Sequence, residues 1–382
     1  MSYKAFQDWY HEAAIKHLLL FEYNGLLISP PFATELCKDY SDLLIIKNSN
    51  EFIKLDIPPG TSKFNCVLDV AGDAWLIPYA IYDHVNVVVQ LKDFKPIYHT
   101  ISSTGKGQFY GGASNGSEGF CFPLGYEGTN YSLHIKNDAV HVIPLDTDNY
   151  KLHMGTVYCN GKFYSMPRGD SPGYGSIMCF DGIDYSEIKL PVDTSITRKY
   201  SDAVVIDNKI YALPFGETAG LTQVVEFDTD TEQISLWNLD IPDFAKKYNV
   251  AVKNAHFIIA VPYGNEDCYD SQWGVVFNTV TKESKKFDIG PSHGGKYRFR
   301  CGILYYNLAV FFPTGTPSCP ILAVSTAGQV VFRKQFDNIL FGRPVIFDQR
   351  IKVIGYDTIT GEHRLYSFDS SLDFSFSKID IA

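Results

Sequence analysis

A group of carboxylates lies beside two large aromatic side chains in the segment GNEDCYDSQWG, residues 264–274. Ca²⁺ takes roughly six to eight oxygen ligands in proteins, and an aromatic ring offers an apolar face on which a sugar can stack. One segment supplies too few oxygens for a complete calcium site, so a solvated polar loop is the alternative interpretation. The candidate residues are Glu266, Asp267, Tyr269, Asp270 and Trp273.

A second polar group lies in PRGDSPGYG, residues 167–175. Arg168 and Asp170 flank a glycine, which makes the Arg-Gly-Asp tripeptide found in integrin ligands. A match of three residues is weak, and an ordinary solvated loop is the alternative. We include Arg168 and Asp170 among the candidate ligand-binding residues.

Basic residues recur at a nearly constant interval along the chain. If these side chains met around one axis, they would hold an anion or an acidic loop of a partner. The structural alternative is that each lysine lays its stem along a neighbouring aromatic ring and pairs with an acid such as Asp202. We favour this alternative, because the lysines repeat in register with packing residues. The residues are Lys16, Lys63, Lys151, Lys199, Lys247 and Lys296, with Arg168, Arg298, Arg300 and Arg343 nearby.

Signatures of catalysis are poor. Residues Gly112 to Gly116 fit the pattern G-x-S-x-G, but that nucleophile motif requires a turn from a strand into a helix, and this segment lies beside a predicted hairpin. His153 and His293 are the histidines that we considered for acid–base chemistry. The eight cysteines form no CxxC motif or zinc-binding spacing. We therefore expect no catalytic residue, no metal and no cofactor, with calcium as the one candidate ion.

The elements that must position these residues follow from an internal repeat. Its clearest copy is KYSDAVVIDNKIYALPFG, residues 199–216. A proline near the end of the phrase recurs at spacings of 48, 45, 44, 47, 48 and 51 residues. A period of about 40–50 residues built of short strands is typical of a β-propeller. The prolines are Pro30, Pro78, Pro123, Pro167, Pro214, Pro262 and Pro313.

Each unit reads as four strands, here named A to D, separated by turn residues. In the fifth unit we predict strands at Ala203–Ile206, Ile210–Pro214, Gln223–Phe227 and Ile234–Leu239. Eight such units follow one another, and seven blades plus a divergent terminal unit is the alternative. Both ends supply whole blades, so ring closure rests on side-chain packing.

Residues 3–14 look helical and would cap the seam between the first and last blades. The predicted organisation is therefore a closure segment at 1–15 and an all-β propeller at 16–382.

The unit resembles Kelch-like propeller repeats of the form K-[WY]-x-G followed by G-K-I-Y-x-I-P-[YF]. The matching residues in the fifth unit are Lys199-Tyr200, Lys209-Ile210-Tyr211 and Pro214-Phe215. The paired glycines of strict Kelch repeats are matched at Gly111-Gly112 and are missing from most units, and the Gly-His and Trp-Asp pattern of WD repeats is absent. The resemblance implies a propeller fold and carries no catalytic motif.

Composition narrows the functional classes. Of 382 residues, 45% are hydrophobic and 15% aromatic, which suits stacked sheets. The net charge of −10 argues against general nucleic-acid binding, which needs a basic surface. We find no signal peptide and no apolar run of roughly 18 residues. We therefore expect a soluble protein made in the cytoplasm, with no membrane insertion.

The functional hypothesis is a non-catalytic recognition or assembly module that binds a protein or a glycan. The D–A and B–C loops lie on one face of a propeller. The recurring lysine precedes strand A and the recurring proline ends strand B, so both repeat markers point to that face. A virion or tail-type attachment component is one setting that fits. A polysaccharide lyase or hydrolase is the alternative, and a structural ring is a third. The candidate face comprises Arg168, Asp170, Lys199, Glu266, Asp267, Tyr269, Trp273, Lys296 and Arg298.

Overall fold

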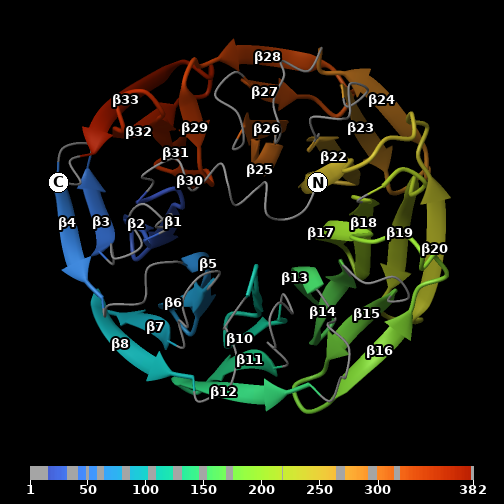
Figure 1. Cartoon of the computed structure of the whole chain (residues 1–382), viewed down its shortest axis with the longest axis horizontal. Helices are drawn as coiled ribbons and strands as arrows, with labels where there is room; N and C mark the ends of the chain where they lie inside the picture. The colour runs from blue at the N-terminus through green and yellow to red at the C-terminus, as the bar shows by residue number, and fades with distance from the viewer. Residues whose placement is uncertain are drawn as a thin grey trace.

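Eight β-sheets are arranged around one axis in the computed structural model (Figure 1). The structure describes residues 16–31, 42–48, 51–57, 64–79, 87–101, 109–123, 131–145, 153–168, 175–216, 218–263, 272–290, 299–313 and 319–379. The prediction of eight blades is confirmed, and the alternative of seven is wrong. The proposed N-terminal helical cap at 1–15 lies outside the described residues.

Seven of the sheets have four antiparallel strands in chain order. The first four blades comprise β1 (Phe21–Tyr23), β2 (Leu26–Ser29), β3 (Asp42–Asn48), β4 (Glu51–Asp56), β5 (Phe64–Val70), β6 (Asp73–Pro78), β7 (Val87–Lys92), β8 (Lys95–Thr100), β9 (Ala113–Ser114), β10 (Glu118–Cys121), β11 (Tyr131–Lys136), β12 (Ala139–Pro144), β13 (His153–Cys159), β14 (Lys162–Pro167), β15 (Ser176–Phe180) and β16 (Tyr185–Lys189).

The last four blades follow the same order, except that in blade eight the short strand β30 also pairs with β31. They comprise β17 (Tyr200–Ile206), β18 (Lys209–Pro214), β19 (Gln223–Asp228), β20 (Gln233–Asn238), β21 (Tyr248–Asn254), β22 (Phe257–Pro262), β23 (Trp273–Asn278), β24 (Ser284–Asp288), β25 (Phe299–Tyr305), β26 (Leu308–Pro313), β27 (Pro320–Val324), β28 (Val330–Gln335), β29 (Ile339–Phe341), β30 (Val345–Phe347), β31 (Arg350–Asp357), β32 (His363–Phe368) and β33 (Phe374–Ile379).

The turn between the third and fourth strands of a blade has a sequence cause. In blade five, Asp228 Oδ1 accepts hydrogen bonds from the backbone nitrogens of Asp230 and Thr231, both at 3.1 Å. Such local bonds from an Asp side chain are what make it a turn former. Asn278 does the same in blade six, and in blade eight Asp369 Oδ1 accepts from the backbone nitrogens of Ser371 and Asp373.

Apolar side chains fill the space between neighbouring blades. Between blades four and five, for example, Tyr164 and Ile177 lie in one cluster with Tyr200, Ile210 and Val225, all buried. The middle strands of the blades are the most buried, and the outermost strands carry the exposed side chains. This burial pattern follows from a ring in which each sheet faces another on both sides.

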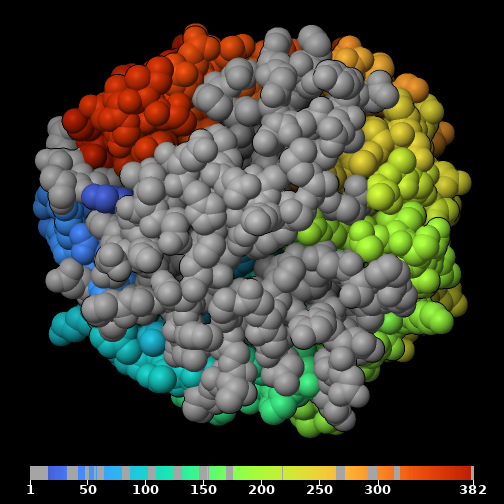
Figure 2. Space-filling model, viewed as in Figure 1, coloured from blue at the N-terminus to red at the C-terminus, as the bar shows by residue number. Residues whose placement is uncertain are grey.

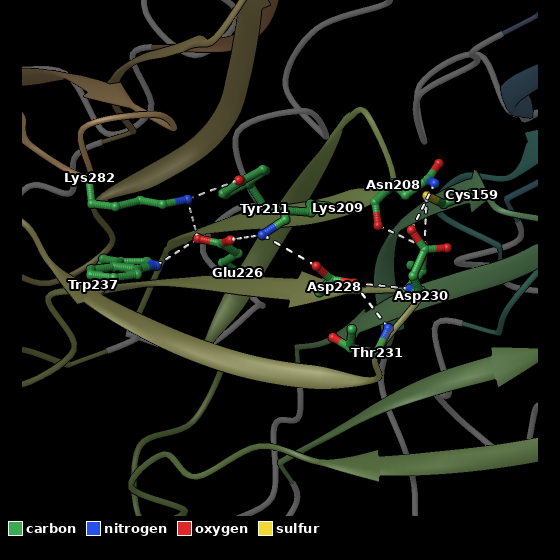
Figure 3. Close-up of polar contacts among 11 residues, drawn as sticks. Cys159, Asn208, Lys209, Tyr211, Glu226, Asp228, Asp230, Thr231, Trp237 and Lys282 are labelled. Atoms are coloured by element: carbon green, nitrogen blue, oxygen red, sulfur yellow. Dashed lines mark hydrogen bonds and ion pairs between the residues drawn. The ribbon is translucent and has the colours of Figure 1, made fainter.

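A polar cluster joins blades five and six near this turn (Figure 3). Glu226 accepts a hydrogen bond from Lys209 at 2.6 Å and, across the blade boundary, from Lys282 at 2.5 Å. Trp237 Nε1 donates to the same carboxylate at 2.8 Å. Burial raises the pKa of Glu226, but these hydrogen bonds outweigh that effect and hold the pKa below its usual value. The cluster therefore contributes to blade packing as a satisfied buried ion pair.

The ring closes between blades one and eight, which lie side by side in Figures 1 and 2. Buried Leu20 and Leu27 pack against Ile354 and Leu365, in line with the expected closure by side chains. Closure also uses the backbone, since the nitrogen of Arg343 donates to the carbonyl of Leu18 at 3.0 Å.

Histidine and glycine complete this seam. His363 Nε2 accepts hydrogen bonds from the backbone nitrogens of Lys16 at 3.2 Å and His17 at 3.3 Å. A Cβ on Gly342 would lie 1.5 Å from the carbonyl oxygen of Leu18, so only glycine permits this close backbone approach.

Candidate functional site

A cavity of about 410 Å³ lies on the axis of the ring and is lined by the innermost segment of every blade. Strands β5, β13, β17 and β25 surround this axis in Figure 1. We call this space the axial cavity. Blades one to eight contribute, in order, Leu18, Asn65, Gly112, Thr156, Ser201, Asn249, Arg300 and Gly342.

The polar lining residues come from a repeated backbone irregularity. The pairing register shifts near the start of the innermost strand in blades two, four, five, six and seven. A bulge of this kind re-aims a side chain and is common beside functional sites. Residues at these shifts that line the cavity are Asn65, Gly155, Thr156, Ser201, Asp202, Asn249, Val250 and Arg300.

The aromatic residue that follows the repeat lysine and the repeat proline hold these bulges in place. Tyr200 lies opposite Pro214 and Tyr248 lies opposite Pro262 in the first hairpin of their blades. Both tyrosines are buried, at 0% and 1% exposure. Because the aromatic residue and the proline are partners in one hairpin, their separation is fixed, and the residues that follow the aromatic residue reach the cavity.

The electrostatics of the cavity centre on Asp202. Its carboxylate accepts hydrogen bonds from the backbone nitrogens of Ala203 at 2.9 Å and of Ala251, in the next blade, at 3.3 Å. Asp202 lines the cavity and is half-buried. Burial of its carboxylate raises the pKa of Asp202 to about 6, against the opposing effects of the two backbone hydrogen bonds and of the charge of Arg343. A carboxyl group with such a pKa changes its charge near neutral pH.

Two arginines from adjacent blades carry positive charge to the same space. Arg300 Nη2 donates to the hydroxyl of Tyr263 at 3.0 Å. The guanidinium of Arg343 lies 5.5 Å from the ring centroid of Phe21. Both arginines line the axial cavity. Among the described lining residues the charged groups are thus two arginines and Asp202.

Neutral polar groups continue around the ring. Ser201 Oγ donates to Asn249 Oδ1 at 2.6 Å. Asn65 Nδ2 donates to the backbone carbonyl of Tyr110 at 2.7 Å. The amide and hydroxyl groups of these side chains both donate and accept, so this lining suits a hydroxylated ligand better than an apolar one.

The lysines of the repeat do not surround this cavity where the structure describes them. Lys199 and Lys247 are fully buried. Lys199 Nζ donates to the carbonyl of Ile196 at 2.6 Å, and burial lowers the pKa of Lys199. Lys247 Nζ donates to Asp243 at 3.0 Å and to the carbonyl of Phe244. These two lysines therefore have the structural role that we favoured from the sequence. Their partners are an acid and backbone carbonyls of the preceding loop, and not Asp202.

The structure describes only part of the sequence-predicted ligand face. Arg168 follows β14, and its carbonyl accepts a hydrogen bond from the nitrogen of Lys199 at 2.9 Å. Trp273 begins β23, and its carbonyl accepts from Tyr248 Oη at 3.2 Å. The remaining candidates lie outside the described residues: Asp170, Glu266, Asp267, Tyr269, Lys296 and Arg298.

The residues considered for catalysis from the sequence show no catalytic arrangement where the structure describes them. Ser114 lies on β9 in a hairpin, and its hydroxyl donates to the carbonyl of Asp69 at 2.5 Å, so the G-x-S-x-G match is not a strand-to-helix turn. His153 is 1% exposed, and His293 lies outside the described residues. Within the described ranges, no group of three or more His, Cys, Asp or Glu side chains is placed to hold a metal ion.

Sequence reasoning missed most of the axial cavity. It named Asp202 only as a partner for lysine, and Arg300 and Arg343 only as neighbours of the lysines. The available signal was the occurrence of polar residues directly after the buried aromatic position, as at Asn65 and Asn249.

The described part of the chain contains no helix with the length and hydrophobicity that a membrane span requires.

Known structures share this fold at very low sequence identity. A computationally designed protein, Ika8, is similar over 94% of this chain and 97% of that chain, with a TM-score of 0.63 and 8% identity. Dihydro-heme d1 dehydrogenase NirN, solved in complex with DHE, is similar over 94% of this chain and 74% of that chain, with a TM-score of 0.64 and 10% identity.

A third similar structure is a catalytically inactive virginiamycin B lyase from Staphylococcus aureus, solved with quinupristin. The similarity covers 78% of this chain and 92% of that chain, with a TM-score of 0.52 and 11% identity. At these identities the similarity shows the fold alone. No protein-family model matches the chain, so its likeness to Kelch repeats remains a resemblance. Comparison with characterised protein sequences finds no relative.

Proposed function

We propose that this propeller is a recognition module that binds a polar ligand, free or carried on a glycan or a protein, in its axial cavity. The ligand would enter from the face of the D–A and B–C loops. The observation that carries the proposal is the set of bulges near the start of five inner strands.

The residues at these bulges support a binding role because they differ between blades. A purely structural position in a repeat tends to keep one residue type, as the buried aromatic residue and the proline do here. The bulges instead carry Asn65 in blade two, Gly155 and Thr156 in blade four, Ser201 and Asp202 in blade five, Asn249 and Val250 in blade six, and Arg300 in blade seven. A cavity of this volume is also within the range of small-molecule sites.

The setting and the partner remain parts of the proposal. A virion or tail-type attachment component is a setting that a glycan-binding or protein-binding module of this kind would serve. The proposed binding needs no cofactor. The calcium alternative concerns the carboxylate-rich segment at 264–274, most of which lies outside the described residues.

An enzyme acting on polysaccharide is the second candidate, and the pKa of Asp202 is the observation that favours it. A carboxyl group with a pKa of about 6 is suited to acid–base chemistry. Most glycoside hydrolases, however, use two carboxylates. Among the described residues that line the axial cavity, Asp202 is the single carboxylate, and no histidine accompanies it. We therefore favour binding over catalysis.

The proposal is tested by filling the axial cavity. Thr156→Trp places a large side chain in the cavity, and Val331→Trp, at a 53% exposed position on β28, is the matched control. Ligand-observed NMR with neutral, acidic and amino sugars would be run on both variants and the wild type. We expect binding to the wild type and to Val331→Trp, and loss of binding in Thr156→Trp with its melting temperature retained. Equal binding to all three proteins would contradict the proposal.

A further inference from the structure

Positive charge predominates among the described residues that line the axial cavity of this acidic protein. Their charged members are two arginines, Arg300 and Arg343, and one acid, Asp202, whereas the whole chain has a net charge of −10. A local field opposite in sign to the net charge of the protein favours the binding of anions at that place. The charge pattern therefore points to an anionic group on the ligand.

The two guanidinium groups act on one region of the cavity wall. Cys301 lies directly after Arg300 and also lines the cavity. Burial raises the pKa of the Cys301 thiol to about 11, and the charges of Arg343 and Arg300 both oppose that rise. Arg300 and Arg343 come from the adjacent blades seven and eight and line the same cavity, so both can act on an anion bound there.

Neighbouring aromatic groups orient both arginines before any ligand arrives. The Tyr263 hydroxyl accepts from Arg300 at 3.0 Å, and the guanidinium of Arg343 stacks near Phe21 at 5.5 Å. A guanidinium presents a planar fork of donors that matches the two oxygens of a carboxylate. Orientation by the protein reduces the entropy lost on binding.

We propose that the axial cavity binds a small hydroxylated carboxylate, of the sugar-acid class, with the carboxylate at Arg300 and Arg343. This inference rests on the proposed function of the cavity as a recognition site. The hydroxyl groups of the ligand would meet the ring of neutral side chains that includes Asn65, Ser201 and Asn249.

Two features favour a sugar acid over other anions. A single carboxylate would balance the excess of one positive charge among the described lining residues, whereas a phosphate dianion would exceed it. An acidic side chain of a peptide could reach the arginines, but it carries no hydroxyl groups for the side-chain amides and hydroxyls opposite. Asp202 also lines the cavity and would repel a second negative charge on the ligand.

The experiment measures the affinity of four probes by isothermal titration calorimetry: D-glucuronate, D-glucose, D-glucose 6-phosphate and a tetraglutamate peptide. The wild type should bind D-glucuronate about tenfold or more tightly than D-glucose, because the charge-assisted hydrogen bonds are missing in the latter. Arg300→Met and Arg343→Met should bring that ratio close to one. Arg350→Met, at an exposed ion pair on β31, is the matched control and should leave the ratio as in the wild type.

A variant that is expected to bind more tightly controls for loss of binding by misfolding. Asp202→Asn removes the only carboxylate among the described lining residues, so it should strengthen D-glucuronate binding by about threefold or more. Loss of binding through unfolding cannot produce this result.

The outcomes separate the two levels of the proposal. Equal affinity for D-glucose and D-glucuronate, unaffected by the arginine variants, would overturn the anion site and leave the cavity as a recognition site. Tighter binding of the phosphate or the peptide would overturn the choice of a sugar acid. No binding of any probe, together with no effect of Thr156→Trp on the sugar panel, would overturn the recognition function as well.

Discussion

Tyr200 lies opposite Pro214 in the first hairpin of blade five, and the pairing register shifts immediately after Tyr200. The same relationship holds between Tyr248 and Pro262 in blade six. The aromatic residue and the proline recur regularly along the sequence, and their pairing sets the position of the bulge. The polar residue of the bulge, which differs between blades, lies toward the axis. Packing and recognition are combined in one short segment of each blade.

Pro214 is a structural residue in this arrangement. Its position at the end of β18 requires no backbone donor, so Pro214→Ala leaves the hairpin bonds intact and increases the entropy of the unfolded chain. We expect the free energy of unfolding to fall by about 1 kcal/mol or less, and ligand binding to persist. Urea unfolding checks the first point; loss of binding at an unchanged melting temperature would argue against a purely structural role.

Closure of the ring requires a glycine at position 342. Gly342→Ala would place a Cβ 1.5 Å from the Leu18 carbonyl oxygen, which is backbone and cannot move aside cheaply. We expect a loss of about 2 kcal/mol or more in the free energy of unfolding, since overpacking forces backbone shifts. Gly111→Ala is the matched control, because no atom lies within 4 Å of its added Cβ. Similar denaturation midpoints for the two variants would contradict this account of the seam.

Glu226 links two blades through a buried ion pair. Glu226→Gln keeps the volume but removes the charge that Lys209 and Lys282 share. We expect a loss of about 1–3 kcal/mol, at the lower end of the cost of breaking a buried pair because both lysines are partly exposed. Glu51→Gln, in the exposed pair with Lys47, should cost about 0.5 kcal/mol or less. Guanidinium unfolding of both variants decides whether the cluster stabilises the ring.

The seam histidines make stability depend on pH. Burial lowers the pKa of His17 from its ordinary 6.5 to about 3 and that of His363 to about 4. The unfolded chain therefore binds more protons below pH 6.5, so this contribution to stability is present above pH 6.5 and is lost as the pH falls toward 4. We expect a loss of about 1 kcal/mol per histidine for each pH unit below about 6.

His363→Gln tests this origin, because a glutamine oxygen accepts the same backbone hydrogen bonds without titrating. The unfolding free energy of the variant should depend less steeply on pH between about 6 and 4 than that of the wild type. Identical slopes for both proteins would show that other groups cause the acid sensitivity.

Asp202 makes the stability depend on pH in the direction opposite to that of the seam histidines. Its folded pKa of about 6 lies above the ordinary 3.8, so its contribution is fully present below pH 3.8 and is lost as the pH rises through 6. The stability difference between the wild type and Asp202→Asn should therefore fall by about 1–2 kcal/mol between pH 4 and pH 7, after allowance for its partial exposure. A difference that does not change with pH would place the carboxyl in a more solvated environment.

The sequence predicted the blades well and the axial cavity poorly, for physical reasons. The aromatic residue and Pro214 recur because hairpin pairing repeats in every blade, so periodicity identifies them directly. Bulges depend on a register shift of one or two residues, which residue types alone do not reveal. Polar residues such as Ser201 and Asp202 therefore read as the end of a loop. Lys199 misled for a related reason, since the carbonyl of Ile196 that satisfies it is visible only in the folded chain.

The central claim is that recognition takes place in the axial cavity, and an amide chemical-shift map tests it most directly. TROSY spectra of the labelled protein would be recorded with and without saturating D-glucuronate. The account predicts that shifts concentrate at Ser201, Asn249 and Arg300, with little change at the C–D turn residues Asp230 and Thr231. Shifts that concentrate at those turns, with the cavity residues unaffected, would contradict it.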